Sequence, residues 1–157
     1  MAVPAATVRQ ITTTSPEATR AFGSSLGALA RAGDVVCLWG ELGAGKTQLA
    51  KGLGAGLGIE ATINSPSFIL MAEYPGRLRL FHVDLYRLAG ASDAIAGGLI
   101  DERQSEGVTV IEWPERLGDA LPADRLDIRF EGTAEEPRLL TIVAAGPRHE
   151  HYLEAKP

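Results

Sequence analysis

The stretch GELGAGKTQ, Gly40 to Gln48, contains residue types that together can bind phosphate groups. It follows the apolar run VVCLW and satisfies the P-loop pattern in full, with Gly45, Lys46 and Thr47 closing it. Glycines permit the sharp turn from a strand into a helix, and successive N–H groups can then surround an anion at the helix N-terminus. The alternative, a glycine-rich turn without a ligand, is disfavoured by this position, and the pattern predicts a nucleoside-triphosphate site.

The side chains of the loop have distinct expected roles. Lys46 would supply positive charge to the β- and γ-phosphate oxygens, and the hydroxyl of Thr47 would ligate Mg²⁺. The loop residues expected to contact the nucleotide are Glu41, Leu42, Gly43, Ala44, Gly45, Lys46, Thr47 and Gln48.

Two acidic residues end apolar runs and are candidates for the carboxylates that nucleotide hydrolysis needs. Glu112 closes VTVIE, the layout of an acid at the carboxyl end of a strand beside the P-loop. Asp84, in LRLFHVDLYR, shares one face of its strand with His82 by the period of two. Each acid could instead be a surface carboxylate at a strand end, and His82 taken alone a packed or hydrogen-bonded histidine.

The sequence favours adenine over guanine as the base. Guanine-reading GTPases carry an N/T-K-x-D loop, and this tetrad is missing from the sequence. A D-x-x-G motif is missing as well, because Asp84 is followed by Leu-Tyr-Arg. ATP is therefore the expected nucleotide, with ADP after hydrolysis.

Strands and helices interleave along the chain. The strands expected from apolar patterning are 7–12, 34–39, 68–74, 77–86, 108–111, 125–130 and 139–143, and Pro75-Gly76 predicts a hairpin. Helices are expected after Ser15-Pro16, over 46–57 and, weakly, over 91–100. This order predicts an α/β fold, namely a three-layer P-loop NTPase fold with a mixed, partly antiparallel central sheet flanked by helices.

The chain of 157 residues fits one domain, expected over 1–146, with 147–157 as a loose tail. We expect His149 and His151 of this tail to be solvated. The net charge of −5 argues against a broad nucleic-acid surface, although Arg77, Arg79 and Arg87 could gather along the hairpin.

The single Cys37 cannot form an internal disulfide and is expected to be a small core residue. Apolar runs of membrane-spanning length and a signal layout are both missing, so we expect a cytoplasmic protein without membrane contact.

The strings GELGAGKTQ, NSPSF, HVDLYRL and IEWPE, in this order and at these separations, resemble the TsaE (YjeE) family. These are small bacterial ATPases required for the threonylcarbamoyladenosine modification of tRNA. The resemblance implies that Thr47 and Glu112 ligate Mg²⁺ and that Asp84 is needed for ATP hydrolysis. Lys46, Asp84 and Glu112 would then form the catalytic set.

The resemblance also assigns switch and binding roles. Ser65, Pro66 and Ser67 would form a switch sensitive to the γ-phosphate, with His82 and Tyr86 in the second switch region around Asp84. Trp113 would lie close to the nucleotide, and Ser15 near the adenine. The implied partners are the threonylcarbamoyl transferase TsaD and its companion subunit TsaB, and contact with tRNA would be indirect.

The chain departs from the family pattern at Gln48 and Ser67, where threonine is usual, and in a glycine-broken segment over 91–100. No arginine is obviously placed over the γ-phosphate, since Arg87 and Arg116 read as surface or partner contacts. We therefore expect tight nucleotide binding and slow hydrolysis.

Two other functions remain open from the sequence. A small-molecule kinase would release ADP faster when its acceptor is added. In a nucleotide-dependent binding module, Asp84→Ala would leave both hydrolysis and modification intact.

Overall fold

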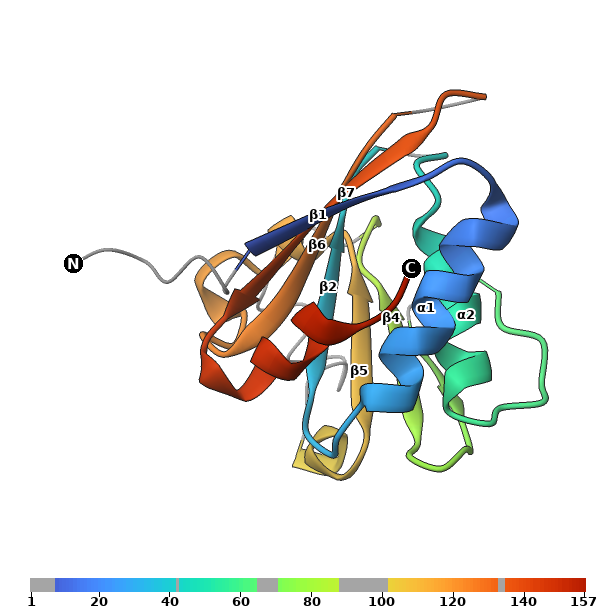
Figure 1. Cartoon of the computed structure of the whole chain (residues 1–157). Helices are drawn as coiled ribbons and strands as arrows, with labels where there is room; N and C mark the ends of the chain where they lie inside the picture. The colour runs from blue at the N-terminus through green and yellow to red at the C-terminus, as the bar shows by residue number, and fades with distance from the viewer. Residues whose placement is uncertain (1–7, 42, 65–70, 88–101, 133–134) are drawn as a thin grey trace.

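A seven-stranded mixed sheet of order β1-β7-β6-β2-β5-β4-β3 forms the centre of the molecule (Figure 1). The computed structural model describes residues 8–41, 43–64, 71–87, 102–132 and 135–157. The strands are β1 (Val8–Thr13), β2 (Val35–Trp39), β3 (Met71–Tyr74), β4 (Leu80–Asp84), β5 (Val108–Glu112), β6 (Arg125–Glu131) and β7 (Arg138–Ala145). The central strands β6, β2, β5 and β4 are parallel, whereas β1, β7 and β3 pair antiparallel. The predicted mixed α/β sheet is confirmed.

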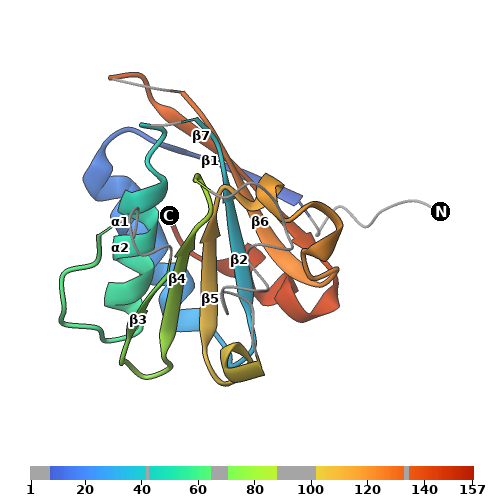
Figure 2. The same ribbon diagram turned by 180° about the vertical axis from the view of Figure 1, so that it is seen from behind.

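Two helices, α1 (Pro16–Leu29) and α2 (Lys46–Gly56), lie together on one face of this sheet (Figures 1 and 2). Ser15 caps α1 as expected, because its hydroxyl oxygen accepts a hydrogen bond from the Ala18 backbone N–H at 3.0 Å. The helices approach so closely that a β-carbon at Gly52 would collide with the carbonyl oxygen of Arg20. This close approach explains the glycines of α2, which cost helix stability when considered alone.

Each face of the sheet carries its own apolar core. The larger core joins the sheet to the helices through buried residues such as Phe22, Leu26 and Leu53. On the opposite face, Cys37 packs with Leu117, close to the 3-10 helices η3 (Pro114–Arg116) and η4 (Gly118–Ala120). Burial, with the nearby charge of Asp127, raises the pKa of the Cys37 thiol far above its ordinary value, so this cysteine is an inert core residue as expected.

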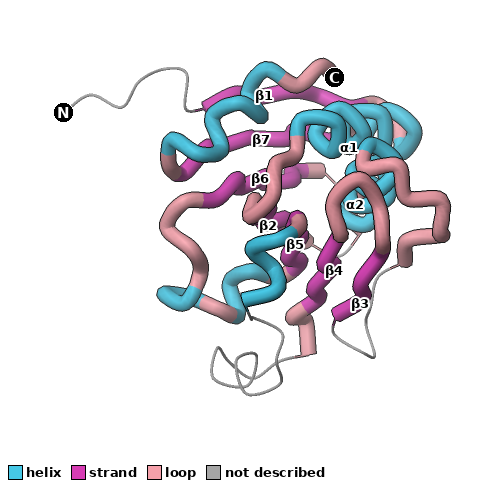
Figure 3. Tube along the Cα trace, turned by 90° about the horizontal axis from the view of Figure 1, so that it is seen from below, coloured by secondary structure: helices cyan, strands magenta, loops and turns pink. Residues whose placement is uncertain are grey.

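The prediction of a loose C-terminal tail is wrong for residues 147–154. They form the 3-10 helix η5 (Pro147–Glu154), and the chain end lies beside α1 in views from two directions (Figures 1 and 3). Tyr152 is fully buried in the larger core. Sequence patterning missed this segment because its two large apolar side chains, Tyr152 and Leu153, are adjacent and give no periodicity, while its polar residues are paired with distant parts of the chain.

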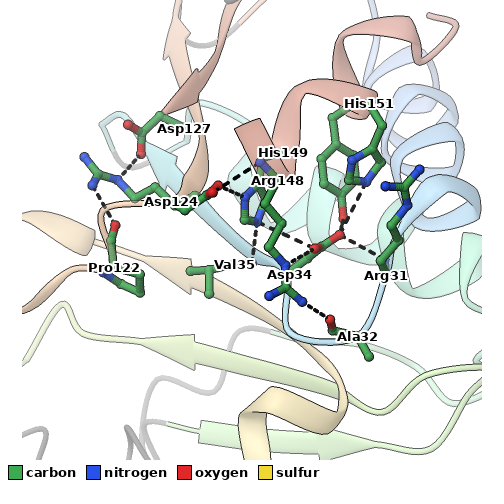
Figure 4. A network of polar contacts seen from close by, with 12 residues as sticks. Arg31, Ala32, Asp34, Val35, Pro122, Asp124, Asp127, Arg148, His149 and His151 are labelled. Atoms are coloured by element: carbon green, nitrogen blue, oxygen red, sulfur yellow. Dashed lines mark hydrogen bonds and ion pairs between the residues drawn. The ribbon is translucent and has the colours of Figure 1, made fainter. Parts of the chain in front are cut away.

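Polar contacts fix η5 in place (Figure 4). The Val35 backbone N–H donates to Nε2 of His149 at 3.0 Å, so the imidazole proton sits on Nδ1, which donates to Asp124 at 2.7 Å. Asp34, fully buried, accepts hydrogen bonds from the Tyr152 hydroxyl and from the Arg31 backbone N–H at 2.9 Å. We call the group Asp34, Asp124, His149, His151 and Tyr152 the C-terminal clamp.

The clamp also corrects the expectation that both histidines are solvated. His149 is fully buried, and the side chain of His151 is 12% exposed with Nε2 at 3.5 Å from Asp34 Oδ2.

Some expectations fall outside the described residues. These are the helix over 91–100, the loop containing Ser65, Pro66 and Ser67, and the position of Leu42. Within the described part of the chain, none of the helices combines the length and the apolar character that crossing a bilayer requires.

Candidate functional site

A cavity of about 900 Å³ lies where α2 begins, at the carboxyl ends of β4 and β5. Open α/β sheets bind ligands at this edge, because the loops that follow the parallel strands converge there. The sequence-predicted residues that line it are Ser15, Gly43, Gly45, Lys46, Thr47, Gln48, Asp84, Tyr86, Glu112 and Trp113.

Three other predicted residues are described but do not line the cavity. Glu41 is exposed, Ala44 is buried, and His82 is fully buried in contact with Glu112.

The P-loop holds backbone angles that glycine adopts easily. Gly43 has φ +79° and Gly45 has φ +102°, in the left-handed region. Gly45 is also the N-cap of α2 and provides no side-chain acceptor. The first-turn N–H groups of α2 are therefore left to a ligand or to solvent, at the positive end of the helix dipole. This end of the helix suits an anion.

Lys46 is folded back onto its own loop. Its Nζ donates to the Gly40 carbonyl at 2.7 Å and lies 3.8 Å from the centroid of the Trp113 ring. Burial lowers the pKa of this amine, although the carboxylates of Glu112 and Asp84 oppose the shift. The ammonium group is thus held at the cavity by contacts that an incoming phosphate can replace.

Trp113 adopts a backbone conformation that is costly for a large residue. Its φ is +60°, the single positive value among the described non-glycine residues. The left-handed conformation costs about 1–2 kcal/mol for an L-residue. It turns the chain from β5 into η3 and places the indole in contact with both Lys46 and the Tyr86 ring, whose centroid is 4.9 Å away. Strain of this kind gathers at functional sites.

Two carboxylates stand side by side at the cavity because β4 and β5 are parallel and place Asp84 opposite Glu112. The buried His82 contacts Glu112 through Nε2, at 2.6 Å from Oε2. Asp84 accepts a hydrogen bond from the Tyr86 backbone N–H at 3.0 Å. One oxygen of each carboxylate is therefore fixed from the protein side, which orients the group toward the cavity.

Sequence reasoning missed several residues of the cavity wall. The β1–α1 junction contributes Thr13, Thr14, Pro16 and Thr19, and the start of β7 with the segment before it contributes Glu135, Glu136 and Arg138. Arg138 donates from Nε to the Ala44 carbonyl at 3.1 Å and from Nη2 to the Gly43 carbonyl at 3.2 Å. These residues are far from the P-loop in sequence, and local patterning gives no signal for them.

The arginines differ in position: Arg116 is exposed, as expected, and Arg87, also exposed, lines the cavity. Arg87 and Arg138 both line the cavity, whereas Arg116 donates to the Tyr86 carbonyl at 3.2 Å and is not among the lining residues. Arg77, a candidate for tRNA contact, instead donates from Nη2 to the carbonyls of Gly27 and Ala30, each at 2.9 Å, at the end of α1.

A parallel strand leading through a glycine loop into a helix, with acids at the ends of neighbouring strands, defines the P-loop NTPase fold. This fold implies nucleotide binding. A family model described as "Threonylcarbamoyl adenosine biosynthesis protein TsaE" matches residues 13–140, and the chain belongs to this family. The family is involved in the biosynthesis of threonylcarbamoyladenosine in tRNA.

Individual relatives agree with this assignment. The chain is 39% identical to "tRNA threonylcarbamoyladenosine biosynthesis protein TsaE" of Bacillus subtilis (strain 168), with 90% of this chain and 89% of that protein covered. It is 42% identical to the protein of the same name from Streptomyces coelicolor, with coverage of 82% and 92%. The crystal structure of Bacillus subtilis YdiB superposes with a TM-score of 0.77 at 36% identity, covering 94% and 92%.

Proposed function

We propose that this protein binds ATP with Mg²⁺ in the cavity and hydrolyses it slowly. The cycle would serve the threonylcarbamoyladenosine modification of tRNA by acting on the transferase TsaD with its companion TsaB, in the cytoplasm. The observation that carries the proposal is the convergence of Lys46, Asp84 and Glu112 on one cavity at the start of α2. The transfer of the threonylcarbamoyl group itself belongs to the partner, and contact with tRNA is indirect.

ATP would lie with its phosphates against the P-loop and the first turn of α2. Lys46 would exchange the Gly40 carbonyl for phosphate oxygens, a stronger, charge-assisted contact. The adenine would lie toward the β1–α1 junction, where Thr13, Ser15 and Pro16 line the wall. The cavity volume of about 900 Å³ falls within the range of small-molecule sites.

The donor set at the cavity fits Mg²⁺, which prefers oxygen ligands and usually keeps waters and substrate phosphates in its coordination. Thr47 and Glu112 would hold it, and His82 fixes the orientation of the Glu112 carboxylate. Within the described ranges, the side chains form no cluster of three or more His, Cys, Asp or Glu residues that could hold a metal ion by themselves. The remaining ligands of Mg²⁺ would therefore be water and phosphate oxygens. When bound with ATP, the ion would neutralise charge on the phosphate oxygens.

Asp84 is the carboxylate that we propose for the hydrolysis step, where it would accept a hydrogen bond from the attacking water. Its position depends on the Tyr86 backbone N–H. We expect slow turnover by the isolated chain because Arg138, a cationic group at the cavity wall, is held on P-loop carbonyls. Binding of TsaD and TsaB would then raise the rate by rearranging the cavity.

The test is ATP turnover by the purified chain, alone and with TsaD and TsaB from the same organism. We expect a rate well below about 10 s⁻¹, the median for enzymes, that rises on addition of the partners and is lost in Asp84→Asn. Asp119→Asn, at an exposed carboxylate of η4, is the matched control and should behave as the wild type. A rate that ignores both partners would remove the partner assignment.

A further inference from the structure

Arg138 connects the P-loop to strand β7, which is separated from β2 by β6. It begins β7, pairs in register with Thr13 of β1, and lines the cavity. Its guanidinium reaches consecutive carbonyls of the loop, Gly43 and Ala44, and also donates to the backbone carbonyl of Glu136. One side chain thus holds both the loop and the segment that precedes β7.

The consequence for the loop follows from peptide geometry. In a planar trans peptide, the carbonyl and the next N–H point in opposite directions. Holding the Ala44 carbonyl therefore fixes the direction of the Gly45 N–H, which lies at the N-cap of α2. A loop with glycines at positions 43 and 45 has little stiffness of its own, since glycine has broad access to both halves of backbone space. The hydrogen bonds from Arg138 therefore fix a loop backbone that its glycines do not fix by themselves.

The positive charge of Arg138 strengthens these hydrogen bonds. Hydrogen bonds from a guanidinium are charge-assisted, and its rigid planar fork suits two acceptors at a fixed spacing. The positive charge also lies at the cavity wall, where it would favour an anionic ligand.

We propose that Arg138 is a positioning residue for phosphate binding, which holds the P-loop in the arrangement that receives the nucleotide phosphates. This inference rests on the proposed nucleotide binding. Arg138 acts through the loop backbone, so its loss should weaken nucleotide affinity and raise KM while leaving kcat nearly unchanged.

The chain provides a matched control for this arginine. Arg77 also donates to two backbone carbonyls, those of Gly27 and Ala30, but at the end of α1 and outside the cavity lining. Arg77→Gln removes the same type of contact without touching the P-loop. A general loss of stability would therefore appear in both variants, whereas a loss of phosphate positioning would appear only in Arg138→Gln.

The experiment measures ADP binding by calorimetry, and KM and kcat for ATP, in the wild type, Arg138→Gln and Arg77→Gln. We expect Arg138→Gln to bind ADP about tenfold more weakly and to raise KM by a similar factor, with kcat within about threefold. Arg77→Gln should bind ADP as the wild type does, although it melts at a lower temperature. Arg138→Lys, which keeps the charge but loses the fork, should fall between wild type and Arg138→Gln.

Wild-type ADP affinity in Arg138→Gln would overturn the inference, and so would equal weakening in Arg77→Gln. If Arg138→Gln does not fold, Arg138→Lys decides: unchanged ADP affinity overturns the inference, and weakened affinity with unchanged kcat supports it. Failure of the wild type to bind ADP would instead remove the proposed function, so the two failures are distinguishable.

Discussion

Two buried histidines pair with carboxylates near opposite ends of β2, and the two pairs differ in what the carboxylate faces. At the P-loop end, His82 lies 2.6 Å from Glu112, which lines the cavity of about 900 Å³. At the other end, His149 lies 2.7 Å from Asp124 in the C-terminal clamp, and its second nitrogen accepts the Val35 N–H. A similar pair thus places its carboxylate at the candidate ligand site in one place and holds the chain end in the other.

The difference teaches that residue type alone does not mark a functional histidine. In the clamp, both ring nitrogens of His149 are used within the protein. At the cavity, the protein fixes Glu112 from one side and leaves it facing the space where a ligand would bind. Loss of the cavity pair should therefore affect turnover, and loss of the clamp should affect stability.

The largest effect is expected from Glu112→Gln, with Asp124→Asn as its counterpart in the clamp. Glu112→Gln should lower ATP turnover by about 100-fold or more, since it removes the proposed Mg²⁺ ligand itself and not only a group that orients a ligand. Asp124→Asn should leave turnover within about threefold, because Asp124 is at the other end of β2. The measurement is kcat at saturating ATP and Mg²⁺. Similar losses of kcat in the two variants would contradict the distinction between the cavity pair and the clamp.

Asp34→Ala should give the largest loss of stability. Asp34 is fully buried and accepts hydrogen bonds from the Tyr152 hydroxyl and the Arg31 N–H. Removing a buried, paired carboxylate should lower the free energy of unfolding by about 3 kcal/mol, which urea denaturation measures. ADP affinity of the folded variant at low temperature should stay that of the wild type. A large loss of affinity without loss of stability would place the clamp in the nucleotide site.

His82→Gln and His149→Gln compare the two histidines directly. His82 orients a proposed metal ligand, so its replacement should lower turnover by about 10- to 100-fold. His149→Gln should lower the melting temperature and leave turnover per folded molecule unchanged. Full turnover of His82→Gln at saturating Mg²⁺ would contradict the proposed role of His82 in orienting Glu112.

The smallest expected effect is the dependence of stability on pH. Burial lowers the pKa of His151 below its ordinary value of 6.5, with the charge of Arg31 adding to the shift, while Asp34 opposes it. The folded state therefore binds fewer protons than the unfolded state below about pH 6.5, and stability falls as the pH decreases from there.

Asp124 adds a second decrease in stability at lower pH. Burial opposes its ionisation, but hydrogen bonds from His149 and the Arg148 N–H outweigh burial and lower its pKa below 3.8. Its contribution is present above about pH 3.8 and is lost as the pH falls through the lowered pKa. Urea denaturation at a series of pH values measures both decreases, and His151→Gln should remove the upper one. An upper decrease that persists in His151→Gln would contradict this assignment.

The sequence predicted those parts of the molecule whose pattern lies within one continuous stretch of the chain. The Ser15 cap, the strand into the P-loop and the positions of Asp84 and Glu112 at strand ends all follow from local spacing. Arg138 could not be predicted, because it reaches the loop only through the order β1-β7-β6-β2. The clamp was missed for the same reason: His149 and Tyr152 are buried against partners more than 100 residues away.

The central claim is that the cavity binds ATP through its phosphates. The most direct test is calorimetric titration of ATP with Mg²⁺ into the wild type and into Lys46→Ala. We predict binding at one site per chain, weakened at least tenfold in Lys46→Ala because the charge at the P-loop is lost. Equal affinity in the two proteins, or no binding by the wild type, would contradict the claim.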